Sequence, residues 1–488
     1  MTDRSALAQA TVLLPALFTV LVAAVPRRAL RAVATAGGLA VPVPALLLAA
    51  VALARPGRVL AGDWIAVDAA GGLLVGVVAL VGSVAVLLSP AYLDTVTRAV
   101  VGPPHRERLY YSVLLAFWTT LLAVPLAGNL GIAWLLIEAT TATSALLVAF
   151  SGRPRALEAG WKYLVLTSLG LGVALFGIVL LSAGAPGGGL GALSWGSLGR
   201  YAAGRDSALA AYLLVTIGLA AKIGWAPVHN WLPDAHSEAP APVSALLSAA
   251  LLPSVLLVAW RCQQGLAPVL GQGTGRGVLV GLGLLSIAVA VPFLARPLAW
   301  KRLLAYSSLE HMGVIALGVG FAGPLALAGA AVHVVAHAAA KTLGFVAMTP
   351  LATHEPLAVS APVGGIGRTR PALGAVLGLS LGTLSGLPPS PLLASELLIV
   401  AGGFASGRPL AAAAAAVLLA LAFLGLLRSL VEFTVGQGPE AGHRRRPSGQ
   451  RGVVLLAVAC AVVLLVLAGT AVWLPGTELV RALGKGIS

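Results

Sequence analysis

Lysine and charged residues in general are scarce in this sequence. Only five lysines occur among 488 residues, so arginine supplies most of the 31 basic side chains. Charged residues make up 10% of the chain, whereas a soluble protein usually carries about 25%. Hydrophobic residues make up 59%, and the mean hydropathy is +0.97. These values exclude an ordinary soluble protein and predict an integral membrane protein.

The chain also has only two cysteines, Cys262 and Cys460, and they are isolated from each other. This number supports neither a disulfide framework nor an iron–sulfur or zinc site built on cysteine. We therefore expect no cofactor and no metal in this chain. The net charge of +15 comes from arginines scattered over short loops, which fits membrane topology better than binding to nucleic acid.

Apolar runs of about 20 residues predict an all-α integral membrane protein with about 14 transmembrane helices. Their approximate cores are residues 6–25, 33–53, 67–91, 109–127, 130–150, 160–183, 207–233, 241–260, 277–294, 303–321, 325–349, 371–403, 409–432 and 452–474. The seventh is interrupted at Pro227 and Pro233, and the twelfth at Gly386-Leu387-Pro388-Pro389.

The two interrupted helices stand five apart in the predicted order. Helices four to eight and nine to thirteen are therefore interpreted as two inverted five-helix repeats, with helices 7 and 12 discontinuous. The predicted parts are an N-terminal three-helix segment, the two repeats and a C-terminal helix, at residues 1–108, 109–261, 276–432 and 450–488. Broken helices at matching positions of inverted repeats point to an ion or substrate path.

The distribution of basic residues predicts the orientation in the membrane. Loops after odd-numbered helices carry 17 Lys and Arg, against 10 in the even-numbered loops and the termini. Because basic loops stay in the cytoplasm, we expect both termini to lie outside the cytoplasm, in a protein of the inner (plasma) membrane.

Three of the five lysines, Lys162, Lys222 and Lys341, lie in or at the edge of apolar runs. An ammonium group at the centre of a membrane helix costs about 2.5–3.5 kcal/mol, so such lysines need a functional reason. Lysine gives up and regains a proton more readily than arginine does. The pattern therefore predicts proton movement. Lys162, with Glu158, lies near the cytoplasmic edge and is interpreted as structural.

Lys222 stands just before the break in the seventh helix, and His229, Asp234, His236 and Glu238 follow it. We interpret this segment as a buried lysine beside a hydrated break, with His229 and His236 as possible relay residues. The alternatives are a polar interfacial loop for Asp234 and Glu238 and a side chain that reaches the interface for Lys222.

Glu138 lies in the middle of the fifth predicted helix. A buried carboxylate should be neutralised or find a cation, and Lys222 is the expected partner because it lies at a similar depth. Such a pair lets a passing charge switch the lysine between its protonated and neutral forms. A structural salt bridge is the alternative.

His333, His337 and Lys341 fall at i, i+4 and i+8 of one helix, about 6 Å of rise apart, so they share a face. Two imidazoles leading to a lysine suggest a proton relay joined by water. A haem or metal held by the HxxxH pair is the competing interpretation, but it needs ligands from a second helix, and the sequence shows no such pair.

Further polar residues extend this axis. Tyr306, Glu310 and His311 open the tenth helix and are either relay residues or interfacial side chains. Glu396 follows the break in the twelfth helix and is interpreted as a terminal proton site. In the alternative interpretation, Glu396 is a structural residue with Arg428 as its counter-ion.

These motifs resemble the antiporter-like membrane subunits shared by respiratory complex I, Mrp-type cation/proton antiporters and membrane-bound hydrogenases. The resemblance rests on the Lys222–Pro240 segment, Lys301–Ser308, the His333/His337/Lys341 ladder, and Gly386–Pro389 with Ser395-Glu396. Within this family, Ile137–Thr141, Gly160–Tyr163 and Ser308–Gly313 look most like component F, the membrane protein of the hydrogenase-4/formate hydrogenlyase type.

The resemblance implies proton-channel roles for Glu138, Lys222, His333, His337, Lys341 and Glu396. It also implies a proton-translocating subunit of a multi-subunit redox complex, with no redox centre in this chain. Its partners would be other membrane subunits and soluble hydrogenase or iron–sulfur subunits. The alternatives are a subunit of an Mrp-like cation/proton antiporter and a non-conducting anchor or inorganic-carbon uptake partner.

One departure from the family pattern concerns the eighth helix. Many relatives carry a lysine there, before a downstream arginine, whereas Pro253 occupies that place here and Arg261 follows. The middle of the expected path then depends on water, His311 or Glu310.

Overall fold

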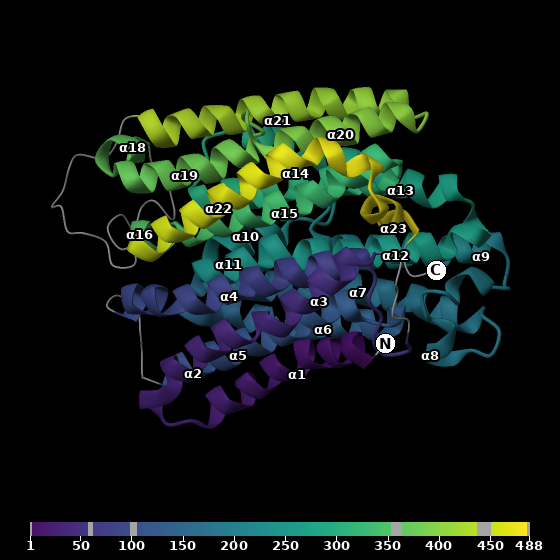
Figure 1. Cartoon of the computed structure of the whole chain (residues 1–488), viewed down its shortest axis with the longest axis horizontal. Coiled ribbons are helices and arrows are strands. Elements are labelled where there is room, and N and C mark those ends of the chain that lie inside the picture. Colours follow the sequence, from purple (N-terminus) through teal and green to yellow (C-terminus); the bar gives the residue numbers. More distant parts are fainter. Residues whose placement is uncertain (1, 57–61, 98–104, 353–363, 437–449, 486–488) are drawn as a thin grey trace.

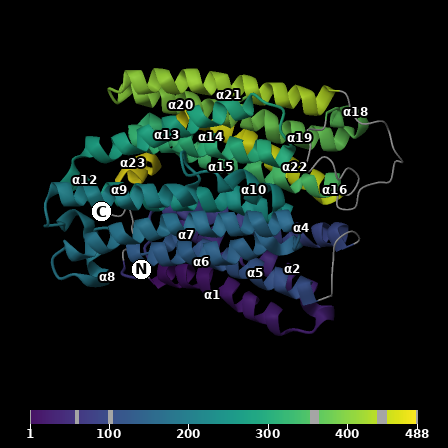
Figure 2. The same cartoon turned by 180° about the vertical axis from the view of Figure 1, so that it is seen from behind.

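The computed structural model describes residues 2–56, 62–97, 105–352, 364–436 and 450–485 as helices joined by short connections (Figures 1 and 2). Isolated β-bridges join Ile65 to Ala127 and Asn129 to Ser194. The predicted all-α fold is confirmed.

The helices of the first part of the chain, which includes the first predicted repeat, are α1 (Thr2–Ala24), α2 (Arg27–Ala40), α3 (Pro42–Ala54), α4 (Ala69–Thr97), α5 (His105–Ala123), α6 (Leu130–Val148), α7 (Pro154–Ala183), α8 (Gly189–Ala192), α9 (Arg205–Ile223), α10 (Trp231–Glu238), α11 (Ala241–Leu246) and α12 (Leu252–Leu270). A π-helical turn, Leu247–Leu251, joins α11 to α12, and short 3-10 turns cover Val124–Leu126, Ala149–Ser151 and Leu198–Arg200.

The helices of the second part are α13 (Gln272–Leu294), α14 (Trp300–Phe321), α15 (Pro324–Val346), α16 (Met348–Ala352), α18 (Ile366–Thr369), α19 (Pro371–Leu384), α20 (Pro391–Ala405), α21 (Pro409–Val435), α22 (Gln450–Thr470) and α23 (Glu478–Lys485). A 3-10 segment, Ala471–Gly476, connects α22 to α23.

Thirteen helices within these described ranges are long and apolar enough to cross a membrane, so the chain is a multi-pass membrane protein. Two of them join neighbouring elements: Arg27–Ala54 spans α2 and α3, and Ala241–Leu270 spans α11 and α12. The thirteen coincide with all the predicted helices except the twelfth. In its place stand two shorter apolar helices, α19 and α20. The start of α1 and the end of α23 lie at the same end of the bundle (Figure 1).

The region predicted as the seventh helix ends early. α9 stops at Ile223 and α10 begins at Trp231, with Pro227 in the connection between them. Pro233 does not interrupt a helix, so that part of the prediction is wrong. It lies in the first turn of α10, where its missing N–H has no intrahelical partner to lose.

Glycine lets two pairs of helices approach closely. A Cβ atom on Gly218 of α9 would lie 2.5 Å from the main-chain oxygen of Gly170 on α7. On α13 and α14, a Cβ on Gly283 or Gly313 would lie 2.7 Å from the main-chain oxygen of the other. This confirms that glycines in the apolar runs serve helix packing.

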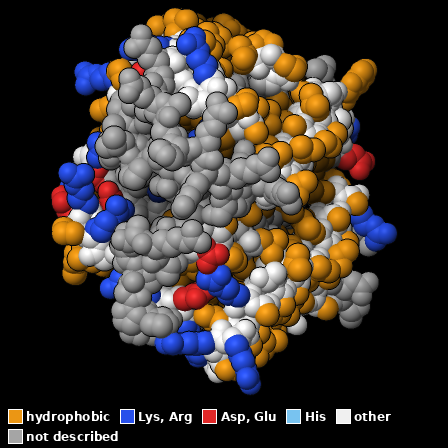
Figure 3. Space-filling view, turned by 90° about the vertical axis from the view of Figure 1, so that its left-hand side faces the viewer, with side chains coloured by type: hydrophobic (Ala, Val, Ile, Leu, Met, Phe, Trp, Pro, Cys, Tyr) orange, Lys and Arg blue, Asp and Glu red, His pale blue; other side chains and the backbone are white. Residues whose placement is uncertain are grey.

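The burial of the spans follows their position. The Ala241–Leu270 span is entirely buried and α14 nearly so, whereas α1 and α22 lie at the rim of the bundle. Exposed apolar side chains such as Leu13 and Leu455 suit the rim helices to contact with lipid. Seen from the end near α2 and α18, Lys, Arg, Asp and Glu side chains gather on this end, while hydrophobic side chains cover one flank (Figure 3).

Candidate functional site

Lys222 occupies the last turn of α9 and is completely buried. Its ammonium group donates hydrogen bonds to the hydroxyl oxygens of Thr141, at 2.7 Å, and of Tyr163. Nζ also lies 4.5 Å from the centre of the Tyr163 ring. The hydroxyl groups of Tyr163 and Ser144 lie 2.7 Å apart and continue the polar contacts toward α6. Lys222 is therefore held by neutral oxygens and an aromatic face.

Glu138 lies on α6 and accepts a hydrogen bond from the hydroxyl group of Ser168 at 2.7 Å. Its other carboxylate oxygen is buried, and no hydrogen-bond partner for it exists among the described residues. The expected direct pair with Lys222 is not formed, because that ammonium group binds Thr141, three residues after Glu138, and Tyr163 instead.

Side chains from three helices satisfy the main chain around the connection between α9 and α10. The indole N–H of Trp231 donates to the main-chain oxygen of Ala221 at 2.6 Å. The N–H of Ala226 donates to the hydroxyl oxygen of Ser286 at 3.1 Å, and the Trp225 indole donates to Met312. Main-chain groups freed by a break are tolerated in a membrane protein where neighbouring helices bind them in this way.

The two histidines of this segment are buried but not satisfied. Neither ring nitrogen of His236 has a hydrogen-bond partner in the part of the chain that the structure describes, and the same holds for Nδ1 of His229. The His236 ring stacks on Phe345 of α15, with centroids 5.1 Å apart. His236 therefore lies between the two halves of the chain, with free ring nitrogens that suit contact with buried water.

Asp234 and Glu238 belong to a charged hollow at one end of the bundle, as the interfacial alternative predicted. Asp234 pairs with Arg302 at 2.7 Å and with Lys162 at 3.4 Å, and Glu238 pairs with Arg153 at 3.2 Å. These residues line a cavity of about 980 Å³. Lys162 also pairs with Glu158 at 2.6 Å, which agrees with its structural interpretation.

Lys341 is the buried cation of the second half. It is completely buried on α15, and its ammonium group donates to the main-chain oxygen of Leu304 on α14 at 2.5 Å. Within the described residues no carboxylate forms an ion pair with it. One turn before it, both ring nitrogens of His337 lack a hydrogen-bond partner in the same ranges.

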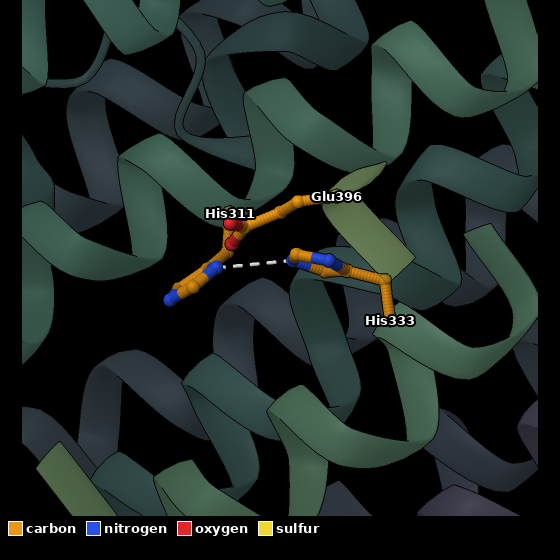
Figure 4. A group of neighbouring side chains, drawn as sticks. All are labelled: His311, His333 and Glu396. Atoms are coloured by element: carbon orange, nitrogen blue, oxygen red, sulfur yellow. Dashed lines mark hydrogen bonds between the residues drawn. The ribbon is translucent and has the colours of Figure 1, made fainter. Parts of the chain in front are cut away.

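His311 and His333 form the closest contact of the predicted axis. Nδ1 of His311, on α14, lies 3.0 Å from Nε2 of His333, on α15 (Figure 4). Nδ1 of His333 lies 2.9 Å from the hydroxyl oxygen of Ser395 on α20. Three helices therefore meet through hydrogen-bonding side chains at this point.

Glu396 follows Ser395 on α20, and its carboxylate reaches the same two histidines (Figure 4). One ligand atom from each of His311, His333 and Glu396 lies within 4.8 Å of the others. The alternative counter-ion for Glu396 is wrong: Arg428 points to the main-chain oxygen of Ala295, at 2.8 Å.

Glu310 and Tyr306 differ in their surroundings. Glu310 is buried, and its Oε2 lies 3.9 Å from Nε2 of His311. Tyr306 is only half-buried and stacks on Phe293, with centroids 4.2 Å apart. Tyr306 is thus placed as the interfacial alternative expects, whereas Glu310 lies beside the histidines.

Pro253 lies in the first turn of α12, directly after the π-helical turn. It borders a small apolar cavity of about 50 Å³, together with Leu256, Trp260 and Val334. No side chain of this lining carries a charge, so the place of the expected lysine is apolar. The polar contact nearest along the chain is between the hydroxyl groups of Ser248 and Ser308, 2.7 Å apart.

Sequence reasoning did not single out Tyr163, Thr141 or Ser395 as contacts of the site. Tyr163 follows Lys162 in an apolar run, and Ser395 precedes Glu396, so a polar residue beside a charged one was the available signal. Their partners lie 59 and 62 residues away along the chain for Tyr163 and Ser395, so spacing alone does not reveal them.

Residues 127–423 match the family model described as NADH:quinone oxidoreductase/Mrp antiporter, TM. A protein named hydrogenase-4 component F homolog, from Methylacidiphilum infernorum, is 34% identical over 339 residues, which is 68% of this chain and 71% of the relative. The NADH-quinone oxidoreductase subunit N of Geobacter metallireducens is 33% identical over 347 residues, 70% of this chain and 71% of the relative.

Three solved structures share the fold, each at 21% identity. They are chains of the Mrp complex from Dietzia, with a TM-score of 0.82 over 99% of this chain and 97% of that one, of the archaeal membrane-bound sulfane sulfur reductase, with 0.81 over 98% and 96%, and of respiratory complex I from Thermus thermophilus, with 0.79 over 98% and 98%.

Proposed function

The chain belongs to the NADH:quinone oxidoreductase/Mrp antiporter family of membrane subunits, and on that premise we propose that it moves protons across the membrane within a multi-subunit redox complex of the hydrogenase-4 type. Redox chemistry in partner subunits would drive protonation changes in this chain. The chain itself would carry no redox cofactor and catalyse no covalent step.

The observation that carries this proposal is the state of Lys222 and Lys341. Both are completely buried in spans, and both bind neutral oxygens rather than carboxylates. A fixed structural charge in such a place is normally paired, because an unpaired buried charge is costly. A lysine that exchanges its proton needs neutral partners that serve both of its forms.

The proposed path begins at Glu138 and Lys222 in the first half. It continues past His236 to the buried groups of the second half and ends at Glu396. His337, Lys341, Glu310, His311 and His333 lie along this part. Several of these side chains have buried nitrogen or oxygen atoms without partners in the described residues: His229, His236, Glu310, His311 and His337. Such atoms favour ordered water, which would join groups that do not touch. Because Pro253 leaves its place apolar, the middle of the path depends on His236, His337, Glu310 and this water.

We also propose that α9 with α10 and α19 with α20 are two discontinuous spans in inverted five-helix repeats, residues 109–261 and 276–432. The positions of the termini support a fourteenth crossing. Thirteen crossings would leave the start of α1 and the end of α23 at opposite ends, but both lie at the same end (Figures 1 and 2). The pair α19 and α20 supplies the missing crossing. Residues 1–108 and 450–488 would then form the flanking helices.

The proposed orientation places both termini outside the cytoplasm, in the inner (plasma) membrane. The charged hollow around Asp234 and Arg302 would then open to the cytoplasm, where it suits proton uptake. The proposed partners are other membrane subunits and soluble hydrogenase or iron–sulfur subunits, in line with what the relatives' names indicate for those proteins.

A second candidate is a subunit of an Mrp-like cation/proton antiporter, favoured by the fold shared with a chain of the Dietzia Mrp complex. A non-conducting anchor, for redox subunits or for inorganic-carbon uptake, is favoured by the apolar surroundings of Pro253. Identifying the other chains of the purified native assembly separates these candidates. Mrp subunits, a carbonic-anhydrase-like partner, or hydrogenase and iron–sulfur subunits would each indicate one of them.

The test of proton movement uses Lys222→Ala and Glu138→Gln in the native assembly. We expect both variants to assemble and to lose most proton translocation in inverted membrane vesicles. Lys162→Met is the matched control, because Lys162 is exposed and bound at the rim by Glu158 and Asp234. Unchanged translocation in both assembled variants would refute the proposed path.

A further inference from the structure

The structure assigns to His311, His333 and Glu396 a buried site for a zinc-class divalent cation, which competes with the proton shared by the two histidines. The three side chains come from α14, α15 and α20, so they are far apart in sequence (Figure 4). One ligand atom of each lies within 4.8 Å of the others. Both histidines are completely buried, while Glu396 is partly exposed.

The hydrogen bonds determine where the lone pair of His333 lies. Ser395 donates its hydroxyl proton to the main-chain oxygen of Leu392 at 2.7 Å, so its oxygen accepts from Nδ1 of His333. A neutral His333 then carries its proton on Nδ1, and Nε2 is an acceptor that points to His311. This arrangement resembles that of a metal-binding histidine, whose second nitrogen is normally fixed by an oxygen acceptor.

The neighbouring nitrogen, Nδ1 of His311, is the donor in this bond, 3.0 Å from Nε2 of His333. Two imidazole nitrogens bound to one tetrahedral zinc ion lie about 3.3 Å apart, because each Zn–N bond is about 2.0–2.1 Å long. The pair therefore needs only a small separation to hold a metal. The ion takes the place of the bridging proton, so metal and proton exclude each other.

Glu310 provides a second place for the displaced proton. Its Oε2 lies 3.9 Å from Nε2 of His311 and has no hydrogen-bond partner in the described ranges. With metal on Nδ1, a neutral His311 carries its proton on Nε2, on the side of this carboxylate. A carboxylate behind a metal-bound imidazole is a common supporting contact.

The ligand set selects the class of ion. Two imidazole nitrogens and one carboxylate oxygen suit zinc and related transition metals, whereas sodium and magnesium prefer oxygen alone. The sequence-based expectation of no metal rested on the apparent lack of ligands from a second helix. α14 and α20 supply them, and His311, rather than His337, is the partner of His333.

The test measures binding of zinc alone to the purified native assembly, by equilibrium binding of radioactive zinc. We expect one saturable ion per copy of this chain, lost in His311→Gln and His333→Gln. X-ray absorption should show two imidazole nitrogens in its coordination. His337→Gln is the matched control, since His337 lies one turn from His333 on the same helix, and it should keep the ion. Full binding in both variants, or equal loss in the control, would overturn the site.

A second variant covers the case in which the ligand variants do not assemble. Ser395→Ala removes the support of His333 without removing a ligand, and loss of such a support typically weakens metal binding by about 10- to 100-fold. Ser395→Thr keeps the hydroxyl group and should bind as the unmodified chain does. Equal affinity in Ser395→Ala would also contradict the site.

Inhibition of proton movement rests on the proposed function, and it has a separate outcome. Zinc should inhibit translocation in the native assembly, with Ser395→Ala requiring about 10- to 100-fold more zinc. If zinc binds at these residues but translocation continues, the metal site stands and the proposed path through His311 and His333 is wrong.

Discussion

The phenolic oxygen of Tyr163 joins Lys222 to Ser144: it accepts a hydrogen bond from the buried ammonium group and lies 2.7 Å from the Ser144 hydroxyl oxygen. Tyr163 comes from α7, Lys222 from α9 and Ser144 from α6. The close approach of α7 and α9 at Gly170 and Gly218 brings these elements together. The packing of three helices thus determines the surroundings of one lysine.

Tyr163→Phe tests this relationship. A hydrogen bond to a charged group contributes about 1.5–3 kcal/mol, and about 1.4 kcal/mol corresponds to a tenfold change in rate. We therefore expect proton translocation in vesicles to fall about tenfold while the complex still assembles. Tyr111→Phe is the control, because the buried Tyr111 hydroxyl group has no hydrogen-bond partner among the described residues. Equal rates in the two variants would show that the Tyr163 hydroxyl group is unimportant.

Arg261 and Asp68 form a buried ion pair, 2.7 Å long, with side chains only 1% and 4% exposed. Arg261 also donates to the main-chain oxygen of Pro125 at 2.9 Å. Removal of one partner leaves an uncompensated buried charge, so Arg261→Met should lower the free energy of unfolding by about 3–5 kcal/mol. Thermal unfolding in detergent measures this change.

The control for that prediction is an exposed pair of the same length, Arg302 with Asp234 at 2.7 Å. Arg302→Met should change the free energy of unfolding by no more than about 1 kcal/mol, because solvent screens this pair. A larger loss of stability for Arg302→Met than for Arg261→Met would contradict the assignment of Arg261 as a structural residue.

Gly218→Ala tests the contact between α7 and α9. The added Cβ would lie 2.5 Å from main-chain atoms of Gly170 and Ala174, which cannot move without shifting the helix. Overpacking of this kind costs about 1–3 kcal/mol, so the melting temperature should fall. In Gly172→Ala, also on α7, the added atom has open space, and stability should stay equal or rise slightly. A Gly218→Ala variant as stable as Gly172→Ala would refute the close approach.

The spans could be predicted from the sequence because each is a long apolar run, and such a run has few alternatives in a membrane protein. The end of α9 was less accessible. Pro227 and Pro233 look alike in the sequence, but the first lies between helices and the second in a first turn. The consequence of a proline depends on whether its N–H would have had a partner, which only the helix bounds show.

The candidate site divides in the same way. Lys222, Lys341 and the histidines stand out because ionisable residues are rare in apolar runs. Their contacts do not stand out, since depth alone suggested Glu138 as the partner of Lys222, while hydroxyl groups from α6 and α7 take that place. Likewise the i, i+4 spacing suggested His337 as the partner of His333, but the crossing of α14 and α15 supplies His311.

The central claim is that a buried lysine without a carboxylate partner carries protons, and Lys341 tests it most directly because its ammonium group binds only the main-chain oxygen of Leu304 among the described residues. The measurement is the initial rate of proton translocation in inverted vesicles with the assembled Lys341→Met variant. A positioned proton-transfer group typically contributes at least about 100-fold, so we predict a rate below about one tenth of the unmodified rate. An unmodified rate in the assembled variant would contradict the account.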